Sequence, residues 1–98
     1  MLVFKDLEWK SWLDGVASSP KFDNGFGLSI VAGPGKYSTP KDKSNSPDDF
    51  VSFEVAVIAP NGDWATKQFV PDHDSDVLGW QDRGQINALM LLVQSKNK

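Results

Sequence analysis

The clearest pattern in the chain is a strict alternation of apolar and polar positions near its first third. Phe26, Leu28, Ile30 and Ala32 are separated by single residues, which is the period of a strand with one face in a core. The preceding Asp-Asn-Gly is typical of a tight turn with positive φ angles. We therefore predict a β-hairpin over residues 16–32, with its proline-containing first arm at a sheet edge.

A second alternation covers residues 50–59, and here both faces carry apolar side chains. A strand that is apolar on both sides is typical of the interior of a sheet. Residues 60–63 read Pro-Asn-Gly-Asp, which predicts another tight turn. Residues 64–70 alternate again and end at Pro71, so we predict an antiparallel return strand there.

The C-terminal segment has a helical period instead. Its apolar residues recur three and four positions apart and predict one buried stripe, formed by Ile86, Leu89, Met90 and Val93. Asp82 is the expected N-cap, because Gln85 follows three residues later and completes a capping box. Leu91 and Leu92 widen the stripe, which predicts a well-buried helix.

The N-terminal segment is harder to assign from its pattern. Trp9, Trp12 and Leu13 have helical spacing, so we predict a short helix or turn over residues 5–13, with Gly15 as its left-handed cap. Apolar and polar positions also alternate in the first residues, so a short strand is the alternative prediction for this segment.

The whole chain, residues 1–98, is expected to form a single α+β domain. Residues 33–49 hold three prolines and two glycines and no aliphatic side chain, so they are predicted to form a long polar loop. The expected architecture is an antiparallel β-meander of about four strands, with the C-terminal α-helix packed on one face.

Composition narrows the classes of function. The chain has no cysteine, which excludes disulfides, thiolate nucleophiles and cysteine-bound zinc. No apolar run approaches the roughly 20 residues that span a bilayer, and the first residues lack the apolar stretch of a signal peptide. We therefore expect a cytoplasmic protein that does not bind membranes.

Charge is distributed unevenly along the chain. Residues 48–82 contain eight acidic residues and one basic residue, and the formal net charge of the whole chain is −3. A negative surface disfavours direct binding to nucleic acid, because phosphate contacts need lysine and arginine. It suits a basic protein partner. The predicted binding residues combine these acids with two exposed aromatic anchors and are Asp48, Asp49, Asp63, Asp72, Asp74, Asp76, Tyr37 and Trp64.

The segment Asp72–Asp76 has acids at alternate positions, like the start of a calcium loop. The pattern then fails, because Val77 stands where that loop needs glycine and Arg83 where it needs glutamate. His73 is the only histidine, which excludes sites with two imidazoles in one chain. We expect a solvated turn and no metal or cofactor, and a divalent-metal-dependent hydrolase stays as an alternative.

The loop 33–49 raises a second alternative. Its Gly-Pro-Gly-Lys start lacks the serine or threonine and the helix of a phosphate-binding loop. Its lysines still surround Tyr37, and lysine with an exposed ring suits the phosphate and base of a nucleotide. A small-ligand or nucleotide-binding protein, acting as a sponge, is therefore kept open.

Three segments together resemble a group of small phage and prophage proteins. They read FDNGFGLSIV at 22–31, FEVAV at 53–57 and DVLGW at 76–80, ahead of a terminal helix, and the resemblance covers roughly residues 22–93. It implies a shared fold and a phage-borne accessory protein that acts in the cytoplasm of the bacterial host. It carries over no catalytic residues.

These observations lead to one expected function. We expect a non-enzymatic phage accessory protein that binds and modulates a host protein through an acidic, aromatic-bearing surface. The expected partner is a basic nucleic-acid-binding or defence protein, for example a nuclease that it inhibits. An exposed edge strand would also allow a homodimer.

Overall fold

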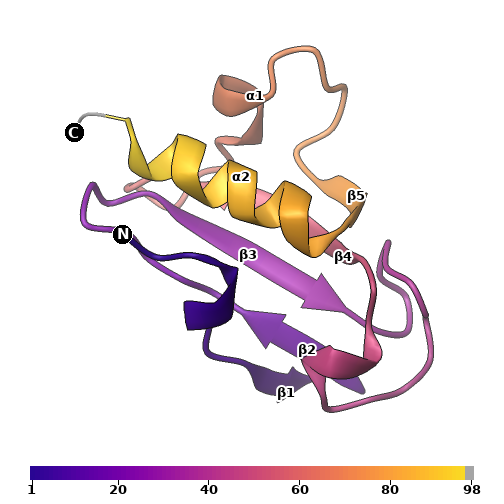
Figure 1. Ribbon diagram of the computed structural model, residues 1–98. Helices are drawn as coiled ribbons and strands as arrows, with labels where there is room; N and C mark the ends of the chain where they lie inside the picture. The colour runs from indigo at the N-terminus through magenta and orange to yellow at the C-terminus, as the bar shows by residue number, and fades with distance from the viewer. Residues whose placement is uncertain (97–98) are drawn as a thin grey trace.

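The computed structural model describes residues 1–96 and places five antiparallel strands in one sheet (Figure 1). The strands are β1 (Lys10–Trp12), β2 (Gly15–Ser18), β3 (Gly27–Ala32), β4 (Phe53–Ile58) and β5 (Leu78–Gln81). Their order in the sheet is their order in the chain, so the sheet is a meander. The predicted α+β class is confirmed, with five strands in place of about four.

The helical elements lie around this sheet. They are the 3-10 turns η1 (Phe4–Asp6) and η2 (Pro47–Asp49), the short helix α1 (Thr66–Phe69) and the C-terminal helix α2 (Arg83–Gln94). Helix α2 lies across one face of the sheet (Figure 1). The predicted loop 33–49 contains no strand or helix before η2.

The core lies between α2 and the sheet. Alternate residues of the two central strands point toward the helix, and Ile30 is paired with Val55 and Leu28 with Val57. The predicted helix stripe meets them, because Ile86, Met90 and Val93 are fully buried. The predicted strand period and helix period therefore meet in one layer of apolar side chains.

The prediction for α2 is confirmed at its N-terminus and wrong on its outer face. The capping box is confirmed, since the Asp82 carboxylate accepts from the Gln85 N–H at 2.8 Å and Gln85 Oε1 accepts from the Asp82 N–H at 2.9 Å. The expected burial of Leu91 and Leu92 is wrong, because they lie on the outer face with 40% and 49% of their surface exposed. One sheet face buries only one stripe of the helix.

The predicted strand over 64–70 is wrong. Trp64 forms one bridge with Ile58, and the chain then turns into α1. The buried Thr66 causes this turn, since its hydroxyl accepts from the Val57 N–H at 2.9 Å and donates to the Asp76 carbonyl at 2.6 Å. The place beside β4 is taken by β5, a strand that the sequence pattern did not predict.

The predicted helix or turn over 5–13 is also wrong, because only η1 is helical there and β1 follows. The β1–β2 turn uses Leu13 and Asp14, whose φ angles are 49° and 64°. Gly15 is no helix cap but a strand residue, and a Cβ there would lie 2.0 Å from the Ala32 carbonyl oxygen. The close approach of β2 and β3 therefore requires glycine.

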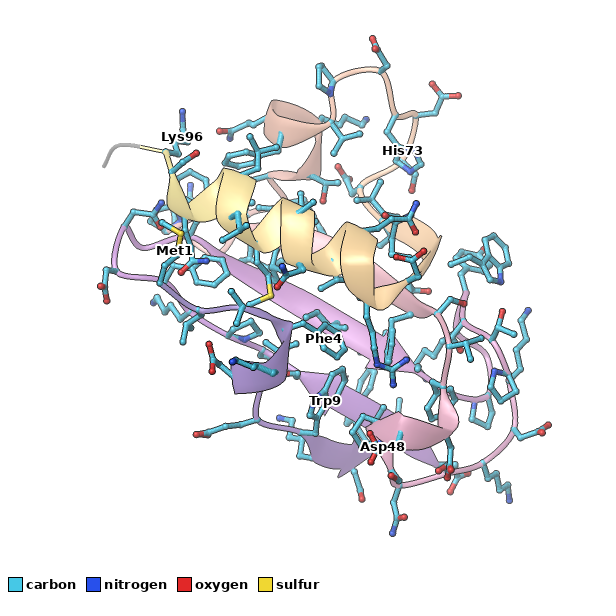
Figure 2. All side chains as sticks on the ribbon, in the orientation of Figure 1. Met1, Phe4, Trp9, Asp48, His73 and Lys96 are labelled. Carbon is cyan, nitrogen blue, oxygen red and sulfur yellow. The ribbon has the colours of Figure 1, made fainter. Side chains whose placement is uncertain are left out.

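The apolar N-terminal side chains explain the path of this segment. The Trp9 ring lies 5.3 Å from the Phe53 ring and 5.9 Å from the Phe4 ring, centroid to centroid. Figure 2 shows Phe4 and Trp9 side by side next to the sheet. Burial of large aromatic side chains contributes more than helix propensity in so short a segment.

The predicted hairpin turn at 23–25 is confirmed, and it has a tertiary role. Gly25 has the positive φ, 92°, and its N–H donates to the Phe22 carbonyl. The Asn24 amide nitrogen donates to the carbonyls of Val93 and Lys96, both at 2.9 Å. The turn thus adds hydrogen bonds to carbonyls at and just beyond the C-terminal end of α2.

Replacement of this asparagine tests the link. We expect Asn24→Ala to lower the free energy of unfolding by about 1–2 kcal/mol, because two hydrogen bonds to the helix end are lost. Asn24→Asp keeps the acceptor for the Phe26 N–H but places a negative charge at a helix C-terminus, so it should be at least as unstable. Urea unfolding measures both variants, and an Asn24→Ala protein as stable as the wild type would contradict the role.

Candidate functional site

Four large aromatic side chains remain about half exposed at the surface. The exposed fractions are 44% for Trp12, 48% for Tyr37, 56% for Trp64 and 54% for Trp80. Tyr37 and Trp64 are the two predicted anchors, and both are accessible. Trp12 and Trp80 were not among the binding residues predicted from the sequence.

The rings of Tyr37 and Trp80 contact each other although the two residues are 43 positions apart in the chain. Their ring centroids are 5.2 Å apart with 36° between the planes. The backbone N–H of Trp80 donates to the Tyr37 carbonyl at 2.8 Å, and the backbone N–H of Tyr37 donates to Glu54 Oε1 at 3.2 Å. These bonds attach the loop to β4 and β5 and fix the backbone positions that carry the two rings.

A β-bulge directs Trp80 toward the surface. Phe53 pairs with Gln81 and Val55 with Leu78, so Glu54 alone opposes two residues of β5. Bulges re-aim side chains in this way. Trp80 adopts a φ of 53°, which costs about 1–2 kcal/mol for a residue with a Cβ. The chain therefore holds an exposed tryptophan in a backbone conformation that bulky residues rarely adopt.

Two lysines of the same loop lie over aromatic rings. Lys36 Nζ is 4.9 Å from the Trp12 ring centroid, and Lys41 Nζ is 6.0 Å from the Tyr37 centroid. Exposed cation–π contacts of this kind contribute about 0.5–1 kcal/mol. We call the set Trp12, Lys36, Tyr37, Lys41 and Trp80 the aromatic patch.

Trp64 does not belong to the aromatic patch. It pairs with Ile58 at the last residue of β4, whereas Tyr37 bonds to Glu54 near the first. These points are four residue positions apart, which is about 13 Å along the strand. The two predicted anchors are therefore at different ends of β4.

The predicted acidic residues also lie in separate places. Asp48 and Asp49 belong to η2, where Asp49 accepts from the Ser44 hydroxyl. Asp63 accepts from the Asn61 amide in the turn before Trp64. Asp72, Asp74 and Asp76 lie in the loop around His73, and Figure 2 shows His73 on the opposite side of the molecule from Asp48.

The loop of residues 72–76 is organised by its own backbone. His73 Nε2 is 2.7 Å from the Val77 carbonyl oxygen, and Ser75 Oγ accepts from the Val77 N–H at 3.2 Å. Such contacts are typical of polar turns. Within residues 1–96, no group of three or more histidine, cysteine or acidic side chains is arranged to hold a metal ion.

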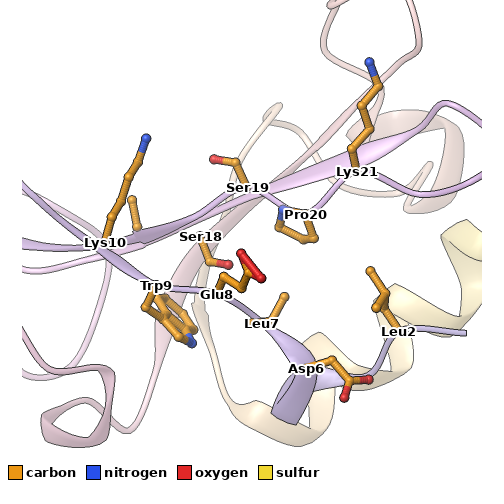
Figure 3. A pocket seen from close by; sticks show the side chains of 11 residues that line it. Leu2, Asp6, Leu7, Glu8, Trp9, Lys10, Ser18, Ser19, Pro20 and Lys21 are labelled. Carbon is orange, nitrogen blue, oxygen red and sulfur yellow. The ribbon is translucent and has the colours of Figure 1, made fainter.

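A groove of about 520 Å³ lies between the N-terminal segment and the end of β2 (Figure 3). Its walls are Leu2, residues 6–10 and residues 17–21. The sequence did not indicate it, because the groove exists only where β1 stops pairing with β2. It shares no residue with the aromatic patch.

The sequence matches no family model, and no curated protein or solved structure matches it. The resemblance to small phage proteins over residues 22–93 therefore stays a prediction. Among the residues that the structure describes, no helix has the length and apolar character needed to cross a membrane.

The strained backbone of Trp80 is directly testable by substitution. We expect Trp80→Gly to leave the free energy of unfolding within about 0.5 kcal/mol of the wild type, because relief at a positive φ offsets the lost ring contact. Trp80→Ala loses the ring but keeps the strained conformation, so it should be about 1 kcal/mol less stable than the glycine variant. Urea unfolding of both variants measures this difference, and equal stabilities would argue against strain.

Proposed function

We propose that this protein is a non-enzymatic accessory protein that binds and modulates a protein partner through its exposed aromatic side chains. The contacting pair Tyr37–Trp80 carries the proposal, because both rings are half exposed and their backbones are held by hydrogen bonds. Tryptophan and tyrosine dominate the binding energy of protein interfaces. Rings that are already fixed lose little conformational entropy when a partner covers them.

The acidic residues supply orientation in this proposal. Asp63 next to Trp64, the pair Asp48 and Asp49, and the loop of residues 72–76 give the partner several negative contacts around the protein. Such charges raise association rates and set the register of a complex more than its affinity. A basic host protein, such as a nucleic-acid-binding or defence protein, fits this charge. A phage origin and action in the bacterial cytoplasm complete the proposal, as the resemblance implies.

A nucleotide or other small anionic ligand is the second candidate. The observation in its favour is the position of Lys36 and Lys41 over the Trp12 and Tyr37 rings, since lysine and exposed rings together suit phosphate and base. Glu54 opposes it, because the carboxylate that accepts from the Tyr37 N–H brings negative charge beside the same rings. The protein partner is therefore the better supported candidate.

Affinity capture from bacterial lysate tests the proposal. We expect a protein to be retained by the immobilised wild type and at least about tenfold less by Trp80→Gly, as for a central interface residue. Leu92→Ala is the matched control, because it removes a similarly exposed apolar side chain from α2. Equal retention by all three proteins would contradict the proposal, and so would release of only a small molecule on heating, detected by mass spectrometry.

A further inference from the structure

The groove of Figure 3 exists because β1 is shorter than the strand beside it. β1 pairs with β2 only from Lys10↔Ala17 to Trp12↔Gly15. Before Lys10 the chain leaves the sheet, since Trp9 packs against Phe53 in the core. The segment 18–21 therefore keeps β3 on one side and has the groove on the other.

The backbone hydrogen bonds show which groups face the groove. Leu28 N–H donates to the Pro20 carbonyl at 3.0 Å, and Phe22 N–H donates to the Phe26 carbonyl at 2.7 Å. Pro20 and Phe22 thus point their backbone groups toward β3. Because this direction alternates along a strand, the N–H and C=O of Ser19 and Lys21 point into the groove.

Pro20 does not interrupt this edge. Its missing N–H lies on the β3 side, where its carbonyl already bonds to Leu28. Within residues 1–96, no hydrogen bond from the N-terminal segment reaches the backbone of Ser19 or Lys21. The groove therefore contains a short strand edge whose hydrogen-bonding groups are free on one side.

The side chains around this edge define what it would accept. Leu2 and Leu7 contribute apolar surface. Figure 3 shows the Glu8 carboxylate directed into the groove toward Ser18, whereas the ammonium groups of Lys10 and Lys21 point away from it. Glu8 is therefore the charged side chain that points into the groove, and a positively charged residue of a ligand would complement it there.

We propose that this groove binds an extended segment of a partner protein, which adds a strand to the edge formed by residues 18–21. Main-chain hydrogen bonds to Ser19 and Lys21 hold the segment, as in other cases of strand addition. One apolar side chain of the segment packs against Leu2 and Leu7. A lysine or arginine of the segment pairs with Glu8 and selects a basic sequence. The site goes beyond the proposed function, because the aromatic patch takes no part in it.

An NMR titration of the full chain labelled with ¹⁵N tests this site. The probe is the acetylated and amidated peptide Thr-Val-Lys-Val-Thr, which favours the extended conformation. We expect the largest shifts, and slower hydrogen exchange, at the Ser19 and Lys21 amides. The matched peptide with glutamate in place of lysine should bind more weakly, because it brings like charge to Glu8.

Two variants separate the backbone and charge contributions. Ser19→Pro removes the N–H that faces the groove and keeps the ladder with β3, so peptide binding should be lost. Glu8→Gln should weaken the lysine peptide by about fivefold, the scale of one partly exposed ion pair. Asp23→Asn is the matched control, because it removes an acidic charge outside the groove and should leave affinity unchanged. The Glu8 variant keeps the test informative if Ser19→Pro does not fold.

Three results would overturn the proposal. The first is the absence of shifts at Ser19 and Lys21 with millimolar peptide. The second is equal affinity for the lysine and glutamate peptides. The third is that hydrogen exchange at these amides becomes slower as the protein concentration increases, with no peptide present. A second copy of the chain would then be the occupant of the groove. Trp80→Gly should leave the titration unchanged, so failure here is distinguishable from failure of the proposed function.

Discussion

One packing arrangement supports the rest of the structure, namely a single helix against one face of a five-stranded sheet. Ile86, Met90 and Val93 of α2 are fully buried on the central strands β3 and β4. The N-terminal segment extends this cover, since Gln94 exchanges two hydrogen bonds with the Leu2 backbone, at 2.8 and 2.7 Å. Asn87 adds a third, from the Phe4 N–H at 2.9 Å. Most of the apolar burial is therefore on one side of the sheet.

The loop of residues 33–49 is tied to the same packing by Arg83. Its guanidinium donates to the Phe50 carbonyl at 2.7 Å and the Pro47 carbonyl at 3.0 Å, and it lies 5.3 Å from the Phe53 ring. The first residue of α2 thus anchors the end of the loop. With its end fixed and Tyr37 bonded to β4 and β5, the loop presents the aromatic patch as a structured surface.

Both candidate binding surfaces occur where regular strand pairing stops. The aromatic patch depends on the bulge at Gly79 and Trp80, and the groove depends on the early end of β1. Irregularities in a sheet redirect side chains or leave backbone groups free. The hydrophobic pattern of the sequence predicts neither surface. A bulge changes the direction in which side chains point without changing the composition of the strand. The function proposed for the chain thus depends on departures from the fold that its pattern predicts.

The sequence alone determined the elements whose cause is local. The alternation from Phe26 to Ala32, the alternation of β4, the Asn-Gly turn and the capping box of α2 each depend on neighbours within a few residues, and each was predicted. Tertiary contacts decided the rest. Thr66 turns the chain into α1 by bonding to Val57 and Asp76, and Trp9 leaves the sheet to pack on Phe53. Tyr37 and Trp80 meet across 43 positions, and no local spacing encodes a contact between residues so distant in the chain.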